Sequence, residues 1–256
     1  MKLRFFCTFA LMKWEIVHLD ETDSTNRWLK DGLAADLRGL TQTVVAVVAD
    51  YQTAGRGCGS NRWESERGQN LLCSLLVHPE SLPANRQFRI SMAVSLALCR
   101  VVEEALEGHY VPLIKWPNDI YVGDRKICGI LIENRLQGGV IKDCIIGVGL
   151  NVNQQRFVSD APNPVSLANL TGRLHDREVL LQRLLEAFDE ECAGLEDVRL
   201  RYLPRLYRRE KFHRYRDAQG EFFARIATVE EDGRLTLETI DGHTNRYAFK
   251  EVQFVL

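Results

Sequence analysis

The sequence predicts an α+β fold, in which a mixed or antiparallel sheet is covered by helices on one face and a small β unit follows. Short apolar segments come in quick succession between residues 111 and 150 with turn-length gaps, as in neighbouring strands of one sheet. Two longer segments, 84–106 and 176–192, have apolar residues at helical spacing and predict helices that pack on this sheet. From about Phe212 onward, apolar and polar residues alternate, which predicts an all-β unit.

The composition is that of a soluble globular protein, because 45% of the 256 residues are hydrophobic and 27% are charged. The formal net charge of −2 and the lack of a basic run argue against a general nucleic-acid-binding protein. No apolar run approaches the roughly 20 residues that a membrane-spanning helix needs. The seven cysteines are scattered without a C-x-x-C pair, which indicates reduced thiols in a cytoplasmic protein rather than disulfides or a zinc site.

We expect the chain to divide into three parts. Residues 1–13 loosely imitate a signal peptide, but no small-residue cleavage site follows, so we interpret them as an N-terminal overhang. Residues 14–208 would form the main domain and residues 209–256 the C-terminal β domain. The second domain is too short to bury a sufficient hydrophobic core by itself, so it should dock on the first.

The chain opens with a short strand at 15–19, a polar loop and a helix that begins near Asn26. Ser24 or Thr25 can cap this helix, because hydroxyl oxygens accept hydrogen bonds from the N–H groups of the first turn. A helix N-terminus also favours anions and acceptor oxygens, so the same residues could face a ligand. Capping alone is the alternative, and the two roles are compatible.

A glycine-rich loop at 50–64 follows an apolar, β-branched segment at 43–49 that reads as a buried strand. Three of its glycines alternate within the loop, namely Gly55, Gly57 and Gly59. Glycine lets a ligand approach the backbone closely, and Arg56 offers a planar fork of donors to a carboxylate or phosphate. We interpret this stretch as an anion-binding loop, with a hairpin turn and a solvated arginine as an equally weighted alternative. The spacing fits neither a Walker A loop nor a dinucleotide fingerprint.

The same two patterns, alternation and helical spacing, place the other elements. Strands are expected at 71–77, 111–114, 120–122, 127–133, 140–141 and 144–150 and, in the C-terminal unit, at 222–229, 235–239 and 246–249. A helical turn is expected at 166–170 and a short helix at 195–206. The basic residues from Arg199 to Lys211 are interrupted by Glu210 and by apolar residues, so we favour a solvated helix face over a nucleic-acid site.

A second candidate site is the segment K-W-P-N-D at 115–119, directly after the predicted strand at 111–114. A lysine that leaves an apolar strand before a Trp-Pro turn is held stiffly and is partly removed from water. Such a lysine is a point charge suited to a phosphate or carboxylate. The alternative for Lys115 is an ordinary surface lysine.

Five short motifs occur in order along the first part of the chain. They are D-S-T-N at 23–26, Q-T-A-G-R-G at 52–57 with a tryptophan at 63, K-W-P-N-D at 115–119, K-I-C-G-I-L-I-E at 126–133 and G-V-G-L-N-V-N at 147–153. With this order and spacing, the chain resembles a biotin–protein ligase of the monofunctional type. Only residues 1–13 precede the first element, which is too few for the helix-turn-helix of DNA-binding relatives, so no DNA partner is expected.

The resemblance implies that the protein activates biotin with ATP to biotinyl-5′-AMP and then transfers biotin to a lysine of a biotin carboxyl carrier protein. Mg²⁺ is expected to offset the phosphate charge, but no motif identifies its ligands. The C-terminal unit resembles the SH3-like barrel of the family, and the protein would be a monomer or a weak homodimer.

Two other functions are weighed against this one. A lipoate or octanoate ligase or transferase of the same fold is the closest alternative, but the G-R-G…W loop and the K-W-P-N-D segment are of the biotin type. A non-catalytic ligand-binding protein would be favoured if Lys115 or Arg56 were missing, and both are present.

The resemblance also implies roles for individual residues. Lys115 and Arg56 would be the catalytic residues and would contact both biotin and the phosphates. The other residues expected to bind biotin are Ser24, Thr25, Asn26, Gln52, Gly57 and Cys58. Trp63 would stack on adenine, and Asn151 would lie near the nucleotide.

One loop position departs from the family pattern. Where Cys58 stands, the family usually has arginine or glutamine, and in members with arginine this side chain helps to hold biotinyl-AMP. Cysteine cannot supply that fork of donors, so we expect faster leakage of the intermediate from this protein. Arg62 is a candidate to replace the missing charge.

Overall fold

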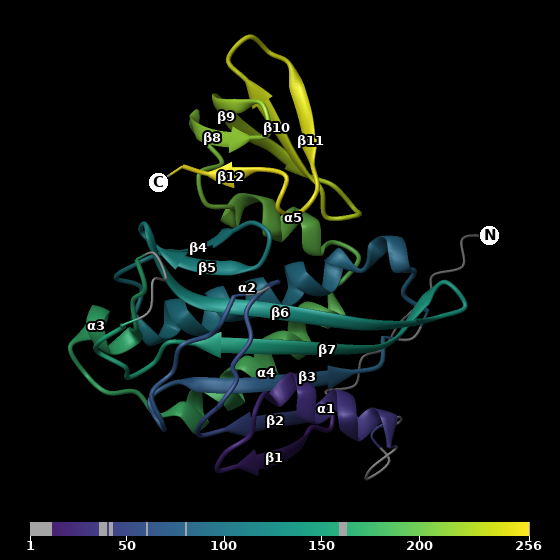
Figure 1. Ribbon diagram of the computed structural model, residues 1–256, viewed down its shortest axis with the longest axis vertical. Helices are drawn as coiled ribbons and strands as arrows, with labels where there is room; N and C mark the ends of the chain where they lie inside the picture. Colours follow the sequence, from purple (N-terminus) through teal and green to yellow (C-terminus); the bar gives the residue numbers. More distant parts are fainter. Residues whose placement is uncertain are drawn as a thin grey trace.

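The computed structural model describes residues 12–35, 40, 43–59, 61–79, 81–158 and 163–255, so most of the predicted overhang lies outside the described residues. The described strands form two sheets, one of seven strands in the order β1-β2-β3-β7-β6-β5-β4 and one of five (Figure 1). The strands of the first sheet are β1 (Glu15–Leu19), β2 (Val45–Ala49), β3 (Leu71–Val77), β4 (Pro112–Lys115), β5 (Asp119–Val122), β6 (Arg125–Gln137) and β7 (Val140–Leu150). β1 and β2 run parallel and the other neighbouring pairs are antiparallel, so the prediction of a mixed sheet is confirmed.

Helices cover both faces of the first sheet, so the prediction that they lie on one face is wrong. The described helices are α1 (Thr25–Ala34), η2 (Ala84–Arg86), α2 (Phe88–Ala105), α3 (Leu167–Thr171), α4 (Arg177–Ala193), α5 (Val198–Tyr202) and η3 (Leu203–Arg205). Leu29 of α1 packs in one cluster with Val47 of β2, whereas the next residue, Val48, faces the opposite core with α2 and α4. In Figure 1, α1 lies in front of the sheet and α2 and α4 lie behind it. α1 joins two parallel neighbours, and such a connection must cross one face of the sheet.

Two strands predicted at 140–141 and 144–150 form the single strand β7. Between them lies Asp143, whose side chain is almost fully buried. It accepts a hydrogen bond from His78 Nδ1 at 2.8 Å and pairs with Arg135 of β6. A buried carboxylate needs such partners, and with them a charged residue can lie within a continuous strand.

The C-terminal strands form the second sheet, in the order β11-β10-β9-β8-β12 and antiparallel throughout. They are β8 (His213–Asp217), β9 (Gly220–Val229), β10 (Leu235–Thr239), β11 (Thr244–Tyr247) and β12 (Gln253–Phe254). Their buried apolar residues belong to the same cluster as the core of the first sheet. The indole N–H of Trp116, which follows β4, donates to the Gly233 carbonyl at 2.9 Å. The two sheets therefore share one core.

The basic group at 199–211 contributes to this junction. Arg199 Nε donates to the Val229 carbonyl at 2.8 Å, and Arg208 donates to the Val255 carbonyl at 2.7 Å. The prediction of a solvated helix face is therefore wrong for these two arginines, because both bind backbone of the C-terminal unit.

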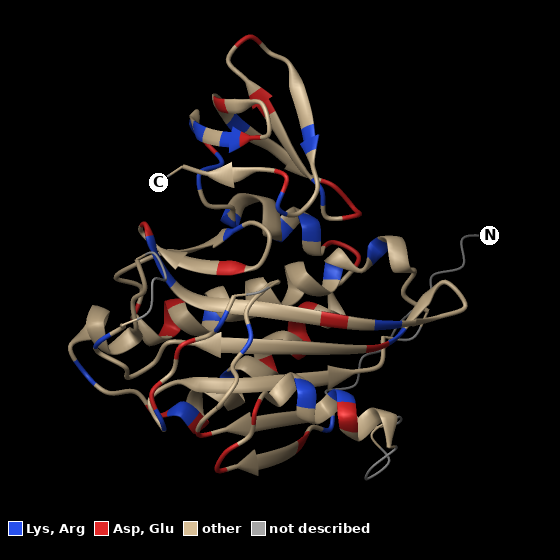
Figure 2. Cartoon of the chain, in the orientation of Figure 1, with Lys and Arg blue, Asp and Glu red and all other residues tan. Residues whose placement is uncertain are grey.

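Acidic and basic residues are interspersed along the chain in Figure 2 rather than gathered in one part of it. Of the helices within the described residues, none is both long and apolar enough to cross a membrane. The six cysteines in the described part of the chain are free, and Cys7 lies outside it.

Candidate active site

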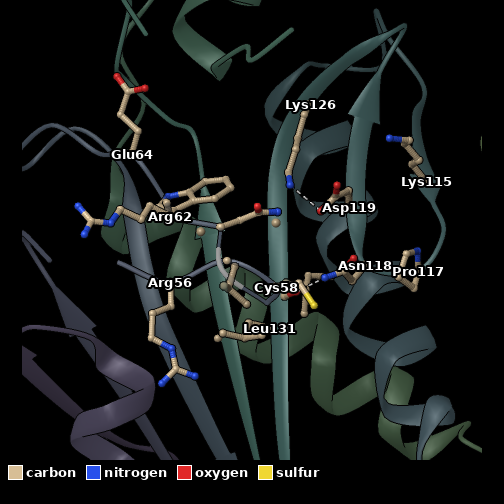
Figure 3. Close-up of a pocket in the computed structure, with 18 of the residues that line it drawn as sticks. Arg56, Cys58, Arg62, Glu64, Lys115, Pro117, Asn118, Asp119, Lys126 and Leu131 are labelled. Atoms are coloured by element: carbon tan, nitrogen blue, oxygen red, sulfur yellow. Dashed lines mark hydrogen bonds and ion pairs between the residues drawn. The ribbon is translucent and has the colours of Figure 1, made fainter. Parts of the chain in front are cut away.

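A cavity of about 860 Å³ lies on the face of the first sheet that also carries α1. Its walls come from the start of α1, the glycine loop, the β4–β5 turn, strands β6 and β7, and the segment 249–254. Figure 3 shows the glycine loop, the β4–β5 turn and β6 around the cavity. The ten residues that the sequence predicted for the site all line this cavity. They are Ser24, Thr25, Asn26, Gln52, Arg56, Gly57, Cys58, Trp63, Lys115 and Asn151.

The glycine loop is a small hairpin, bridged between Arg56 and Arg62. The Trp63 N–H donates to the Gly55 carbonyl at 3.0 Å. A Cβ atom at Gly55 would lie 2.8 Å from the Trp63 carbonyl oxygen, so the turn requires glycine at that position. The hairpin of the alternative interpretation is confirmed, whereas anion binding stays a prediction for a loop whose Arg56 and Cys58 line the cavity.

Buried polar side chains form a chain of hydrogen bonds at the start of α1. The N-cap residue Ser24 makes no side-chain capping bond, so the predicted capping is wrong for this residue. Gln52 Oε1 instead accepts from the Thr25 backbone N–H at 2.8 Å, and the loop thereby satisfies the first turn. Thr25 Oγ1 lies 2.6 Å from Ser74 Oγ, which also lies 2.6 Å from Asn26 Oδ1.

Asn26 is held from the other side by Glu133 of β6. Asn26 Nδ2 donates to Glu133 Oε2 at 2.9 Å, and Arg56 donates to Oε1 at 3.1 Å. Burial alone would raise the pKa of Glu133, but the Asn26 hydrogen bond and the Arg56 charge outweigh it and hold the pKa below its usual value. A Cβ atom at Gly147 of β7 would collide with the Asn26 side chain, so this glycine makes room for it.

The Trp63 indole lies against a glycine surface on the sheet. Gly129 of β6 and Gly149 of β7 are paired neighbours, and Cβ atoms there would lie 2.8 Å and 2.5 Å from the indole. Lys126 Nζ lies 5.5 Å from the ring centroid and pairs with Asp119 at 2.7 Å. The indole Nε1 is buried and has no hydrogen-bond partner among the described residues. The glycines of β7 thus leave room for side chains of the protein itself, with Asn26 at Gly147 and Trp63 at Gly149.

Lys115 is the last residue of β4, and its side chain lies in a wall of the cavity that is partly shielded from water. Its Nζ donates to the Tyr121 hydroxyl at 3.2 Å and lies 4.9 Å and 5.4 Å from the ring centroids of Tyr121 and Phe254. Burial lowers the pKa of Lys115, although the nearby Asp119 carboxylate acts in the opposite direction. In Figure 3, Lys115 and Arg56 lie on opposite sides of the cavity. The cavity therefore has a positively charged side chain on each of two opposite sides.

Asn151 follows β7 and is 3% exposed. Its Nδ2 donates to the Val165 carbonyl at 3.1 Å, whereas its Oδ1 is buried without a partner in the described part of the chain. A buried acceptor left unpaired costs about 1–3 kcal/mol, so a ligand that donates to this oxygen would be favoured.

Several cavity residues were not found by sequence reasoning. The K-W-P-N-D motif contains Asn118 and Asp119, but the pattern gives them no separate role. The segment 249–254 was assigned only to the β unit, yet it forms part of the wall. Lys250 Nζ lies against Gly59 of the glycine loop. A contact between segments so far apart in the chain leaves no local signal in either of them.

The comparisons with known proteins agree with this geometry. The sequence model of the biotin/lipoate A/B protein ligase family matches residues 19–151. The chain is 31% identical over 257 residues to the bifunctional ligase/repressor BirA of Bacillus subtilis, with 96% of this chain and 76% of that protein covered. It is 32% identical over 183 residues to the biotin–[acetyl-CoA-carboxylase] ligase of Paracoccus denitrificans, with 70% and 73% covered.

Solved structures extend the similarity to the fold. A mutant biotin protein ligase from Aquifex aeolicus in complex with biotin superposes with a TM-score of 0.71 at 25% identity. The match covers 94% of this chain and 98% of that chain, so it includes both sheets. The chain therefore belongs to the biotin/lipoate A/B protein ligase family.

Proposed function

We propose that this protein is a biotin–protein ligase, which uses ATP to convert biotin into biotinyl-5′-AMP and then transfers biotin to a lysine of a carrier protein. The observation that carries the proposal is the convergence of the ten predicted residues on one cavity. The relatives named above are ligases by name, and the Aquifex aeolicus structure contains biotin.

The polar groups at the start of α1 suit the ureido ring of biotin, which has two N–H donors and one carbonyl acceptor. Because Gln52 Oε1 accepts from Thr25, the Gln52 amide nitrogen is left to donate to the ureido carbonyl. The hydroxyl oxygens of Ser24 and Thr25 line the cavity and supply acceptors for the ureido N–H groups. This end of the cavity would therefore bind the biotin ring.

The opposite wall suits a nucleotide. Trp63 offers the adenine ring a stacking surface, and Asn151 Oδ1 offers an unpaired acceptor to the adenine amino group. Mg²⁺ would supply positive charge to the phosphates and be held mainly by their oxygens, since no group of three acidic, His or Cys side chains gathers within the described residues. Glu64 and Asp119 line the cavity but lie apart in Figure 3, and Asp119 pairs with Lys126, so we assign no protein ligand to the ion.

The first reaction joins a carboxylate oxygen of biotin to the α-phosphorus of ATP and releases pyrophosphate. Both reactants are anions, so the site must offset their repulsion while it holds them together. Lys115 carries its charge in a wall where water screens it weakly, and Arg56 adds a fork of donors. In the second reaction the carrier's lysine amine attacks the acyl carbon of biotin, and AMP leaves.

Finer features belong to the same proposal. Residues 14–208 would be the catalytic domain and residues 209–256 an SH3-like barrel, which agrees with the five antiparallel strands of the second sheet. The carrier would be a biotin carboxyl carrier protein, and both would act in the cytoplasm. The protein would be a monomer or a weak homodimer, and β1 is an edge strand that could pair with a second copy.

Exchange of labelled pyrophosphate into ATP tests the proposal. The wild-type protein would be assayed separately with biotin, lipoate and octanoate. Exchange with biotin alone is the expected result. Exchange with lipoate or octanoate in its place would assign the protein to the alternative ligases of this fold, and no exchange with any acid would contradict an adenylating enzyme.

The fall of the pyrophosphate exchange rate at high pH should depend on the charge of Lys115. Because burial lowers the pKa of Lys115 below its usual value of 10.5, the side chain loses its charge at a lower pH than an exposed lysine does. We expect the exchange rate to fall on the alkaline side with an apparent pKa below 10.5. Lys115→Arg should move this fall to higher pH, because guanidinium stays charged. If the exchange rate falls at the same pH in the wild type and in Lys115→Arg, Lys115 is excluded as the group that causes the fall.

Cys58→Arg should slow the release of biotinyl-AMP about tenfold, because a charged hydrogen bond to the phosphate is gained. Cys58 lies near the tip of the hairpin and lines the cavity (Figure 3). Release would be measured by rapid filtration of enzyme preloaded with labelled biotinyl-AMP. Cys58→Ser is the control, since it adds no fork of donors. Equal release from the wild type and Cys58→Arg would contradict the expectation.

A further inference from the structure

The carboxylate of Glu133 lies where the two ends of the proposed site meet. Glu133 does not line the cavity itself. It accepts hydrogen bonds from Asn26 at 2.9 Å and from Arg56 at 3.1 Å, and Lys30 Nζ lies 3.6 Å away. Asn26 belongs to the biotin end and Arg56 to the phosphate end, so one side chain contacts both.

Glu133 sets the direction of the hydrogen bonds at the biotin end. A carboxylate can only accept, so Asn26 turns its Nδ2 toward Glu133 at 2.9 Å, and toward the Leu131 carbonyl at 3.3 Å, and its Oδ1 toward Ser74. Ser74 has a single proton, which it must donate to Oδ1. Thr25 Oγ1 lies 2.6 Å from Ser74 Oγ and 3.2 Å from Gln52 Oε1, so its single proton goes to one of these two oxygens and a lone pair of Oγ1 is left to accept from the cavity. Glu133, with the Leu131 carbonyl beside it, thus supports the arrangement in which the Thr25 oxygen can accept a ureido N–H group.

Glu133 also restrains Arg56. The Arg56 side chain is 42% exposed, and a long side chain on a hairpin has many accessible rotamers. The bond to Glu133 holds the guanidinium beside the cavity before any ligand arrives. A group ordered in advance loses less entropy when it binds a phosphate.

We propose that Glu133 is a positioning residue that orients Asn26 for biotin and Arg56 for phosphate, and that it supports the affinity for both substrates at once. This inference rests on the proposed ligase function. It assigns a role to the last residue of the K-I-C-G-I-L-I-E segment at 126–133.

Glu133→Gln tests the role, because it removes the charge and keeps the shape of the side chain. In biotin-dependent pyrophosphate exchange, KM for biotin and KM for ATP should each rise about tenfold, with a smaller change in kcat. Glu133→Asp, which keeps the charge, should recover much of the affinity for ATP. In an Arg56→Ala background, Glu133→Gln should still raise KM for biotin but no longer that for ATP.

Glu103→Gln is the matched control. Glu103 pairs with Arg205 at 2.8 Å outside the cavity, and its side chain is 32% exposed, against 24% for Glu133. This variant should keep both KM values. Thermal melting of each variant separates a loss of folding from a loss of affinity, since an unfolded fraction lowers kcat and leaves KM unchanged.

Unchanged KM values in Glu133→Gln would overturn the inference, even if the melting temperature fell. So would an ATP effect that persists in full without Arg56. A wild-type protein without biotin-dependent exchange would overturn the proposed function itself, and that result is seen before any Glu133 variant is compared.

Discussion

Replacing Lys115 with alanine should slow biotin-dependent pyrophosphate exchange about 10²- to 10³-fold, the range seen when one preorganised charge-stabilising donor is removed. Its Nζ lies beside the rings of Tyr121 and Phe254, where burial already lowers its pKa. A charge in such a wall is weakly screened, so it offsets the repulsion between the biotin carboxylate and the α-phosphate. The measurement is the initial exchange rate at saturating biotin and ATP.

The control for this variant is Lys142→Ala, which removes an exposed lysine of β7 that does not line the cavity. It should keep the wild-type rate. A loss of less than about tenfold in Lys115→Ala, or an equal loss in both variants, would contradict the catalytic role of Lys115.

Replacing Trp63 with alanine should raise KM for ATP about 10- to 100-fold and change KM for biotin much less, because stacking on an aromatic side chain is worth about 1–3 kcal/mol per base. The indole already packs against Gly129 and Gly149, so it is held in the cavity before the nucleotide binds. The two KM values would be measured in the same exchange assay with one substrate varied at a time.

Gly149→Ala tests the position of the Trp63 indole, because Gly149 lies directly against that ring. The new Cβ atom would lie 2.5 Å from the indole, so the ring must move, and KM for ATP should rise by less than in Trp63→Ala. Trp14→Ala is the control, because Trp14 packs near Phe188 and does not line the cavity. A wild-type KM for ATP in Trp63→Ala would exclude stacking on this side chain.

The strands that form the site could be predicted because their patterns are local. The face that α1 covers could not be predicted, since all five residues of β2 (Val45–Ala49) are buried and no polar residue marks a solvent side. With both faces apolar, only the parallel pairing of β1 with β2 decides that the intervening helix must cross the sheet.

The site residues could be predicted as a set, but their bonding could not. The motifs identify Asn26 and Arg56, yet only the fold places both on the Glu133 carboxylate. The wall formed by 249–254 also depends on how a distant β unit docks. Hydrogen-bond geometry and contacts between distant segments are tertiary properties, and a local pattern of residue types does not contain them.

The shared core of the two sheets has a consequence for local opening. The apolar residues of both sheets form one buried cluster, and Trp116 bonds to Gly233 across the junction. Neither sheet can open without uncovering part of the other, so the molecule should behave as one cooperative unit. A ligand in a cavity walled by both parts stabilises that whole unit. Bound biotin and ATP would therefore slow hydrogen exchange at backbone amides of the C-terminal sheet as well as around the glycine loop.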